Sequence, residues 1–142
     1  MKIRTFQASD EASVIALWTA CDLVRPWNDP HKDIVRKLSE QPEMFLVGEI
    51  AGDAGEALVA SVMAGFDGHR GWLNYLAVAP AYRHRSFGRQ IVAEAERMLT
   101  ERGCPKLNLQ IRSSNAAVLA FYARLGYTVD EVVSLGKRLI PD

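Results

Sequence analysis

The sequence predicts an α/β (α+β) fold, in which strands and helices alternate along the chain and the strands build one sheet. Three observations lead to this class. Residues 72–103 read as an apolar strand, a turn, a basic loop and a long amphipathic helix. Residues 44–50 and 57–66 are apolar runs joined by a turn-rich segment, which indicates two strands. Residues 106–112 alternate between apolar and polar side chains, as a half-buried strand does.

The long helix is the most strongly patterned element. Its apolar residues recur at spacings of three and four and form one stripe, made by Phe87, Ile91, Ala95, Met98 and Leu99. A cation, a glycine and a proline follow in the run 102–105, and together they end a helix. We therefore expect the helix to begin near residue 87 and to end before residue 103.

The start of this helix predicts an anion site. Arg83, His84, Arg85 and Arg89 gather there, although the formal net charge of the chain is zero. The first turn of a helix carries backbone N–H groups without partners and a partial positive charge, so cations at this point favour phosphate binding. The alternative interpretation is a solvated basic turn. The strand that ends just before the loop and the helix that follows it favour the functional interpretation.

Length and composition predict one domain, residues 1–142. Apolar residues make up 49% of the chain, which is enough for a full core, and charged residues make up 24%. The absence of a basic excess argues against a nucleic-acid partner, and no apolar run is long enough to suggest a membrane span. Cys21 and Cys104 lack the spacing of metal ligands, so we expect no metal and two reduced thiols in a cytoplasmic protein.

The N-terminal third predicts a strand and two helices. Residues 2–7 read as the first strand, and Ser9 is suited to cap the helix that follows. One face of that helix carries core positions, namely Val14, Leu17, Trp18 and Cys21. A second helix is expected over about residues 33–39. Between the two helices, prolines interrupt the pattern on both sides of Trp27, which is either a packing anchor or a wall of a substrate pocket.

Residues 67–71 form a turn before the strand at Trp72. Asp67 and His69 are the acid and the histidine closest to this strand end. A turn aspartate usually accepts hydrogen bonds from its own backbone, and we take that as the favoured interpretation over a catalytic one.

The last third predicts a helix after residues 113–115, ended by Gly126. Residues 127–140 are expected to supply the last strands of the sheet.

Two stretches of the sequence carry a family resemblance. The first is Leu76-Ala77-Val78-x-Pro-x-Tyr82-Arg83-x-Arg85-x-x-Gly88, which resembles the acyl-CoA signature Arg/Gln-x-x-Gly-x-Gly/Ala of the GNAT N-acetyltransferase superfamily. Ser86 stands where the middle glycine is expected. Serine is small and is able to cap a helix, but it tolerates positive φ less well than glycine does, which predicts an altered loop or a weaker affinity.

The second match is the run from Asn115 to Tyr127, which resembles the pattern Asn-x-x-Ala-x-x-x-Tyr-x-x-x-Gly-Phe/Tyr. Two motifs in the right order are far more specific than either one alone, and the resemblance covers nearly the whole chain. The run 21–30 and the turn 67–71 also resemble those of a small bacterial acetyltransferase. The resemblance implies a mixed, mostly antiparallel sheet of six to seven strands with helices on both faces, whose fourth and fifth strands splay apart at Val78.

The resemblance also implies roles for individual residues. The cofactor-binding set for acetyl-CoA is Leu76, Ala77, Val78, Arg83, His84, Arg85, Ser86, Phe87, Gly88, Arg89 and Asn115. Tyr122 is implied near the thioester sulfur as the proton donor, against the alternative of a core aromatic. Candidates for contact with the acceptor are Arg25, Trp27, Asn28, Asp29, Asp67 and His69.

The implied reaction is the direct transfer of an acetyl group from acetyl-CoA to an amine in a ternary complex. Relatives often place a glutamate where this chain has Asn74 and Gln110, and neither amide accepts a proton. Ordered water with Glu49, Asp67 or His69 as a distant acceptor is one alternative. A catalytically weak module that binds or senses acetyl-CoA is another function that the sequence allows. A P-loop is disfavoured, because Gly-x-x-x-x-Gly-Lys-Ser/Thr is absent. Monomer and homodimer both remain open.

Overall fold

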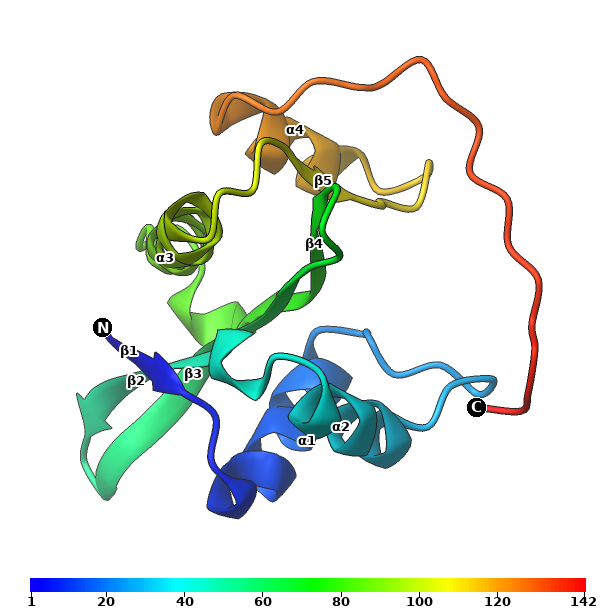
Figure 1. Ribbon diagram of the computed structural model, residues 1–142. Coiled ribbons are helices and arrows are strands. Elements are labelled where there is room, and N and C mark those ends of the chain that lie inside the picture. Colours follow the sequence, from blue (N-terminus) through cyan, green and yellow to red (C-terminus); the bar gives the residue numbers. More distant parts are fainter. The chain divides into compact units, whose positions relative to one another are not determined.

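A computed structural model describes residues 1–142, which form two compact units, 1–109 and 110–142. The first unit contains a five-stranded sheet with the strands in sequence order. The strands are β1 (Lys2–Thr5), β2 (Phe45–Gly52), β3 (Gly55–Phe66), β4 (Gly71–Val78) and β5 (Leu107–Leu109) (Figure 1).

The sheet is mixed and mostly antiparallel, as the resemblance implies. β1 to β4 pair antiparallel in succession, and β5 pairs parallel to β4. The count is five strands instead of the six to seven expected. The two-residue connection between β2 and β3 is shorter than expected, so that β2 reaches Gly52 and β3 begins at Gly55.

Helices cover both faces of this sheet. α1 (Glu11–Ala20) and α2 (Pro30–Ser39) lie together on one face, and α3 (Phe87–Glu101) lies on the other (Figure 1). Three short 3-10 helices link the elements: Ala8–Asp10, Pro42–Met44 and Pro80–Tyr82. None of the helices is long and apolar enough to cross a membrane.

Two predicted helix starts differ from the structure. Ser9 does not cap α1, because a 3-10 turn precedes the helix and Asp10 occupies the N-cap position. The Asp10 carboxylate accepts the backbone N–H of Gln7 at 2.8 Å instead. α2 begins at Pro30 rather than near residue 33, because proline is well suited to the first helical position after an aspartate cap.

The core between the sheet and α1 is aromatic. Phe6 stacks on Phe45 with ring centroids 4.3 Å apart, and fully buried Trp18 packs beside Phe45. Burying polar groups costs stability unless they find partners. Trp18 meets this condition, because its Nε1–H donates to the buried Ser61 hydroxyl at 2.9 Å. Val14 and Leu17 join the same cluster, as the helical spacing predicts.

β4 is irregular in its second half. Its register with β3 shifts between Ser61 and Met63, so that β4 carries one extra residue there. Within this bulge Tyr75 takes a left-handed φ of 53°, which is uncommon for a residue other than glycine. On the other edge, pairing with β5 ends at Leu73–Leu109. The two strands therefore part after Leu73, five residues earlier than the expected point at Val78.

The second unit contains one helix, α4 (Ala116–Arg124). The Asn115 side chain caps it by accepting the Val118 N–H at 3.2 Å, and Gly126 follows the helix with a φ of 93°. Both features agree with the sequence pattern.

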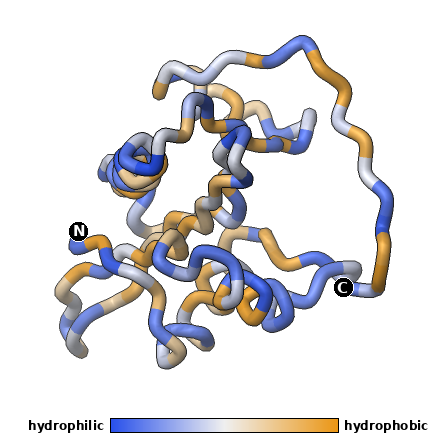
Figure 2. The backbone as a smooth tube through the Cα atoms, viewed as in Figure 1, coloured by the Kyte–Doolittle hydropathy of each residue, from blue (hydrophilic) through white to orange (hydrophobic).

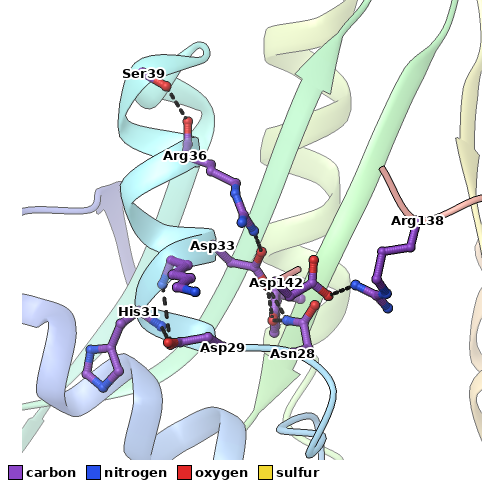
Figure 3. Close-up of polar contacts among 10 residues, drawn as sticks. Asn28, Asp29, His31, Asp33, Arg36, Ser39, Arg138 and Asp142 are labelled. Atoms are coloured by element: carbon purple, nitrogen blue, oxygen red, sulfur yellow. Dashed lines mark hydrogen bonds and ion pairs between the residues drawn. The ribbon is translucent and has the colours of Figure 1, made fainter. Parts of the chain in front are cut away.

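The prediction of strands in residues 127–140 is wrong. This segment contains no strand, and its apolar side chains are exposed, including Val129, Val133 and Leu135. Polar and apolar stretches succeed one another along it without a regular period of two (Figure 2), and a strand needs a paired neighbour to form. An ion pair between Arg138 and Asp142 lies at its end (Figure 3).

Candidate active site

The basic loop between β4 and α3, residues 83–86, has a strained backbone. His84 and Ser86 both take left-handed conformations, with φ of 64° and 63°. Ser86 stands at the N-cap position, but its side chain makes no capping hydrogen bond, and its carbonyl accepts the Gln90 N–H at 3.0 Å. The serine thus adopts the conformation for which glycine is the usual residue, and the loop keeps its turn at a conformational cost.

The arginines of this loop and of the first turn of α3 lack acidic partners. Arg83, Arg85 and Arg89 are exposed, and none of them forms an ion pair with a carboxylate of the protein. The Arg85 guanidinium lies 5.2 Å from the centre of the Tyr82 ring, a cation–π contact that orients it. Gly88 is buried in the first turn of α3. Unpaired arginines beside free helix amides form a site suited to phosphate groups.

Beyond Leu73, no strand pairs with β4 on the edge opposite β3. The Ala79 N–H donates to Val59 of β3 at 2.8 Å. Successive residues of a strand direct their backbone groups to opposite edges, so the Val78 N–H points away from β3. The Val78 carbonyl on that edge accepts the Cys21 thiol at 3.3 Å. Leu76 and Ala77 belong to the same stretch, and Ala77 is buried.

Tyr122 lies on α4 in the second unit and is 5% exposed. Its ring makes edge contacts with Phe121 and Tyr127, at centroid distances of 5.0 and 5.2 Å. Burial raises the pKa of the Tyr122 phenol well above its usual value near 10. The phenol therefore stays protonated over the whole neutral and mildly alkaline range. It is a hydrogen-bond donor in that range and a weaker acid than an exposed tyrosine.

Two residues predicted to contact the acceptor, Asp29 and Asp67, accept hydrogen bonds from the backbone of their own turns. Asp29 caps α2, and its carboxylate accepts the N–H of His31 at 2.9 Å (Figure 3). Asp67 accepts the N–H groups of His69 and Arg70 at 2.8 and 2.7 Å. These bonds lower the pKa of Asp67, the bond from Arg70 first. The favoured interpretation of a turn aspartate thus agrees with the structure.

Two other candidates lie on the surface. Trp27 is 55% exposed, which rules out the interpretation as a core packing anchor. His69 is exposed in the turn before β4. Arg25 pairs with Asp22 at 3.5 Å, within the same loop as Trp27.

Among the residues predicted to contact the acceptor, Asn28 lies in a cluster of polar side chains. Its partners in that cluster were not predicted from the sequence. Asp33 and Tyr75 contact Asn28 from α2 and β4. In the sequence Asp33 looks like a solvated helix residue between Lys32 and Arg36. Tyr75 looks like an ordinary strand residue, because the bulge that turns it depends on pairing with β3. The only local signal was the Asp-Pro pair at residues 29–30, which starts α2 early enough to include Asp33.

The distant proton acceptors suggested by the sequence are engaged elsewhere or exposed. Glu49 pairs with Arg4 at 3.2 Å and with Lys2 at 3.9 Å, in a network that fastens β1 to β2. Asn74 and Gln110, at the positions where the resemblance implies a glutamate, are both exposed. No group of three or more His, Cys, Asp or Glu side chains is arranged to hold a metal ion.

Comparison with known proteins identifies the same fold and family. The model of the acetyltransferase (GNAT) family matches residues 12–127. An acetyltransferase of Yersinia enterocolitica is 51% identical over 142 residues, covering 100% of this chain and 98% of the relative.

Among solved structures, Ard1 from Thermoplasma volcanium superposes with a TM-score of 0.75 at 18% identity, covering 91% of this chain and 83% of that one. AAC(6')-Iy in complex with the bisubstrate analogue CoA-S-monomethyl-acetylneamine gives a TM-score of 0.75 at 18% identity, covering 96% and 97%.

Proposed function

The chain belongs to the acetyltransferase (GNAT) family of acyltransferases, and from this premise we propose that it transfers an acetyl group from acetyl-CoA to a primary amine. The acceptor is a small molecule, a protein N-terminus or a lysine side chain. The observation that carries the proposal is the set of unpaired arginines at the start of α3, next to a strand edge that has parted from its neighbour.

The basic loop is the proposed site for the phosphates of acetyl-CoA. Arg83 and Arg85 supply charge, and the first N–H groups of α3 supply directed donors. The buried Gly88 allows the helix to pack closely at this point. The remaining members of the implied set, His84, Ser86, Phe87 and Arg89, belong to the same loop and first turn.

The open edge of β4 is the proposed site for the pantetheine arm. The amides of that arm pair with backbone groups of Leu76 and Val78, much as an added strand does, and Ala77 lies between them with its backbone groups directed toward β3. Asn115 is assigned to the same arm from the family pattern. The Val78 N–H, directed away from β3, is the proposed donor for the oxyanion of the tetrahedral intermediate.

The chemistry requires a neutral amine. An alkylamine has a pKa of about 10.4, so deprotonation at pH 7 costs roughly 4–5 kcal/mol. The amine nitrogen then attacks the thioester carbon, the C–S bond breaks, and CoA leaves as a thiolate that takes up a proton or a hydrogen bond. Tyr122 is the proposed donor to that sulfur. Its raised pKa favours hydrogen-bond donation over complete proton transfer.

Steady-state kinetics of Tyr122→Phe test this role. We expect kcat to fall about 10- to 1000-fold with little change in the KM for acetyl-CoA, since general-acid assistance typically contributes about 10²–10⁴-fold. Wild-type kcat should show no decline from ionisation of Tyr122 between pH 7 and 10, because burial raises the phenol pKa. Phe121→Leu, which alters the neighbouring ring and keeps the hydroxyl, is the matched control. An unchanged kcat in Tyr122→Phe would contradict the assignment.

A catalytically weak acetyl-CoA sensor is the second candidate. It is favoured by Ser86 in a strained conformation and by the lack of a carboxylate at Asn74 and Gln110. The two candidates predict different results with the wild-type protein. A sensor binds acetyl-CoA and releases no CoA when amines are added, whereas an acetyltransferase releases one CoA for each amine acetylated.

The whole chain, residues 1–142, is proposed to act as one acetyltransferase domain. The family match from residue 12 to residue 127 includes parts of both compact units, which supports this view. Cys21 and Cys104 are free thiols, as is typical of a reducing compartment, and this supports a cytoplasmic location.

A further inference from the structure

Three polar side chains from three segments of the first unit meet beside β4. The Tyr75 hydroxyl donates to Oδ2 of Asp33 at 2.5 Å. The Asn28 amide donates to the Tyr75 hydroxyl oxygen at 2.8 Å and also to Oδ2 of Asp33. Figure 3 shows Asn28 and Asp33 directed toward each other, with Arg36 on the far side of the carboxylate. We call Asn28, Asp33 and Tyr75 the acceptor cluster.

The acceptor cluster is rigidly supported. The Tyr75 ring stacks on Trp18 at 3.9 Å between centroids, and Trp18 is fully buried. The Ser61 hydroxyl accepts from Trp18 and donates to the Tyr75 carbonyl at 3.2 Å, which fixes the backbone inside the bulge. A side chain held by stacking and by bonds to its own backbone loses little freedom when a ligand arrives.

The position of the acceptor cluster links it to the open edge of β4. Tyr75 directly precedes the stretch from Leu76 to Val78. The segment after α1 follows that half of the strand, because Cys21 contacts Val78 and Asn28 contacts Tyr75. A ligand at the acceptor cluster therefore lies beside the backbone to which the pantetheine arm is assigned above.

Asp33 retains capacity to bind a cation. Its carboxylate accepts two donors on Oδ2, and Arg36 binds Oδ1 at 3.2 Å, while a carboxylate has about four acceptor positions. Its side chain is 22% exposed, so it is partly desolvated and still reachable. By contrast, the carboxylates of Asp29 and Asp67 accept the backbone N–H groups of their own turns.

We propose that Asp33 is the counter-ion of the acceptor, and that the acceptor is a primary amine which arrives as a cation. Asp33 contacts the ammonium group, and Tyr75 and Asn28 are positioning residues that hold the carboxylate. This inference rests on the proposed function, because it assigns the second substrate of the same site. Anionic and apolar acceptors are excluded by this proposal, because the oxygens of Asp33 and Tyr75 bind them poorly.

The side chains that contact the Asp33 carboxylate come from three segments of the first unit. Arg36 faces it from its own helix, Tyr75 from β4, and the uncharged Asn28 from the loop; Trp18 of α1 contributes no charge. The attraction is therefore set by the Asp33 carboxylate and by the charge of the incoming amine.

The test uses the full-length protein with cadaverine, benzylamine and a short peptide with a free N-terminus as probes, and thiol release as the signal. In Asp33→Asn the KM for the amine should rise about 10- to 100-fold, the strength of one charge-assisted contact, while the KM for acetyl-CoA stays within twofold. The wild-type KM for the amine should rise with salt, and this dependence should be smaller in Asp33→Asn. A merely structural role does not produce that difference.

Tyr75→Phe keeps the ring on Trp18 and removes the hydroxyl, so it tests the positioning role without emptying the core. We expect an amine KM about 3- to 10-fold above wild type, with the salt dependence retained. Asp33→Glu should recover part of the affinity that Asp33→Asn loses. Asp53→Asn, in the β2–β3 turn, is the matched control for loss of one carboxylate and should leave both KM values unchanged.

The outcomes distinguish a failure of the proposed function from a failure of the role proposed for Asp33. If acetyl-CoA fails to bind the wild-type protein, the proposed function itself fails. If acetyl-CoA binds and either no cationic probe is acetylated or the amine KM of Asp33→Asn equals that of wild type, this inference is overturned while acetyl-CoA binding stands.

Discussion

The basic loop follows β4 and the acceptor cluster includes Tyr75 of β4, but the two regions differ in exposure and in the partners of their polar groups. The loop is exposed, its arginines lack carboxylate partners, and its backbone is strained at His84 and Ser86. The acceptor cluster is half-buried, and its polar groups bond to one another. A polyanion is bound best by charges that the protein leaves available, whereas one small cation is bound best by oxygens that are already fixed.

Removing the cations from the loop should have the largest effect. For Arg83→Ala/Arg85→Ala we expect acetyl-CoA affinity to fall about 10²–10⁴-fold, because each charge-assisted contact contributes about 1.5–3 kcal/mol. Calorimetric titration measures this change. Arg97→Ala/Arg102→Ala is the matched control, since those arginines lie on or just after α3 and pair with protein carboxylates. Equal losses in both double variants would mean that general charge, and not the loop, binds the cofactor.

Removing the support beneath the acceptor cluster should have an intermediate effect. Ser61→Ala leaves the buried Trp18 N–H without its acceptor and releases the Tyr75 carbonyl. We expect the free energy of unfolding to fall by about 1–3 kcal/mol, measured by urea denaturation. Ser39→Ala, which removes an exposed hydroxyl bond to Arg36, should change it by less than about 0.5 kcal/mol. Equal values for the two variants would show that the buried network adds no stability.

Relieving strain in the loop should have the smallest effect. Glycine takes positive φ without steric cost, whereas other residues pay about 1–2 kcal/mol there, part of which the greater freedom of unfolded glycine offsets. Ser86→Gly should therefore raise the free energy of unfolding by about 0.5–1 kcal/mol, without weakening acetyl-CoA binding. Urea denaturation and titration measure the two quantities. Ser114→Gly, outside the left-handed region, should give no gain. A loss of affinity in Ser86→Gly would show that the serine side chain contributes to the site.

The sequence predicted features whose signals are local. The apolar stripe of α3, the Asn115 cap and the terminating Gly126 each depend on residues within one or two helical turns. The expectation at Ser86 was also local, because serine replaces the glycine of the family pattern. An altered loop was one expected result, whereas Ser86 in fact takes the left-handed backbone that glycine usually adopts.

Features that depend on distant partners were predicted less well. The resemblance implied that β4 and β5 part at Val78, but their actual parting after Leu73 and the bulge at Tyr75 arise from pairing between strands. The same dependence explains why the expectation of strands in residues 127–140 was wrong. A strand needs a neighbouring strand to pair with, and apolar side chains alone do not provide one. Asp33 was missed because its contact with Tyr75 joins residues 42 positions apart.

The most direct test of the account is calorimetric titration of the wild-type protein with acetyl-CoA, with CoA and ATP titrated in parallel. We expect micromolar binding of acetyl-CoA and CoA and much weaker binding of ATP, because the loop and the β4 edge together recognise phosphates and the pantetheine arm. Equal affinity for ATP would reduce the site to a general phosphate site. Absence of acetyl-CoA binding would contradict the assignment of the basic loop and the β4 edge as the acetyl-CoA site.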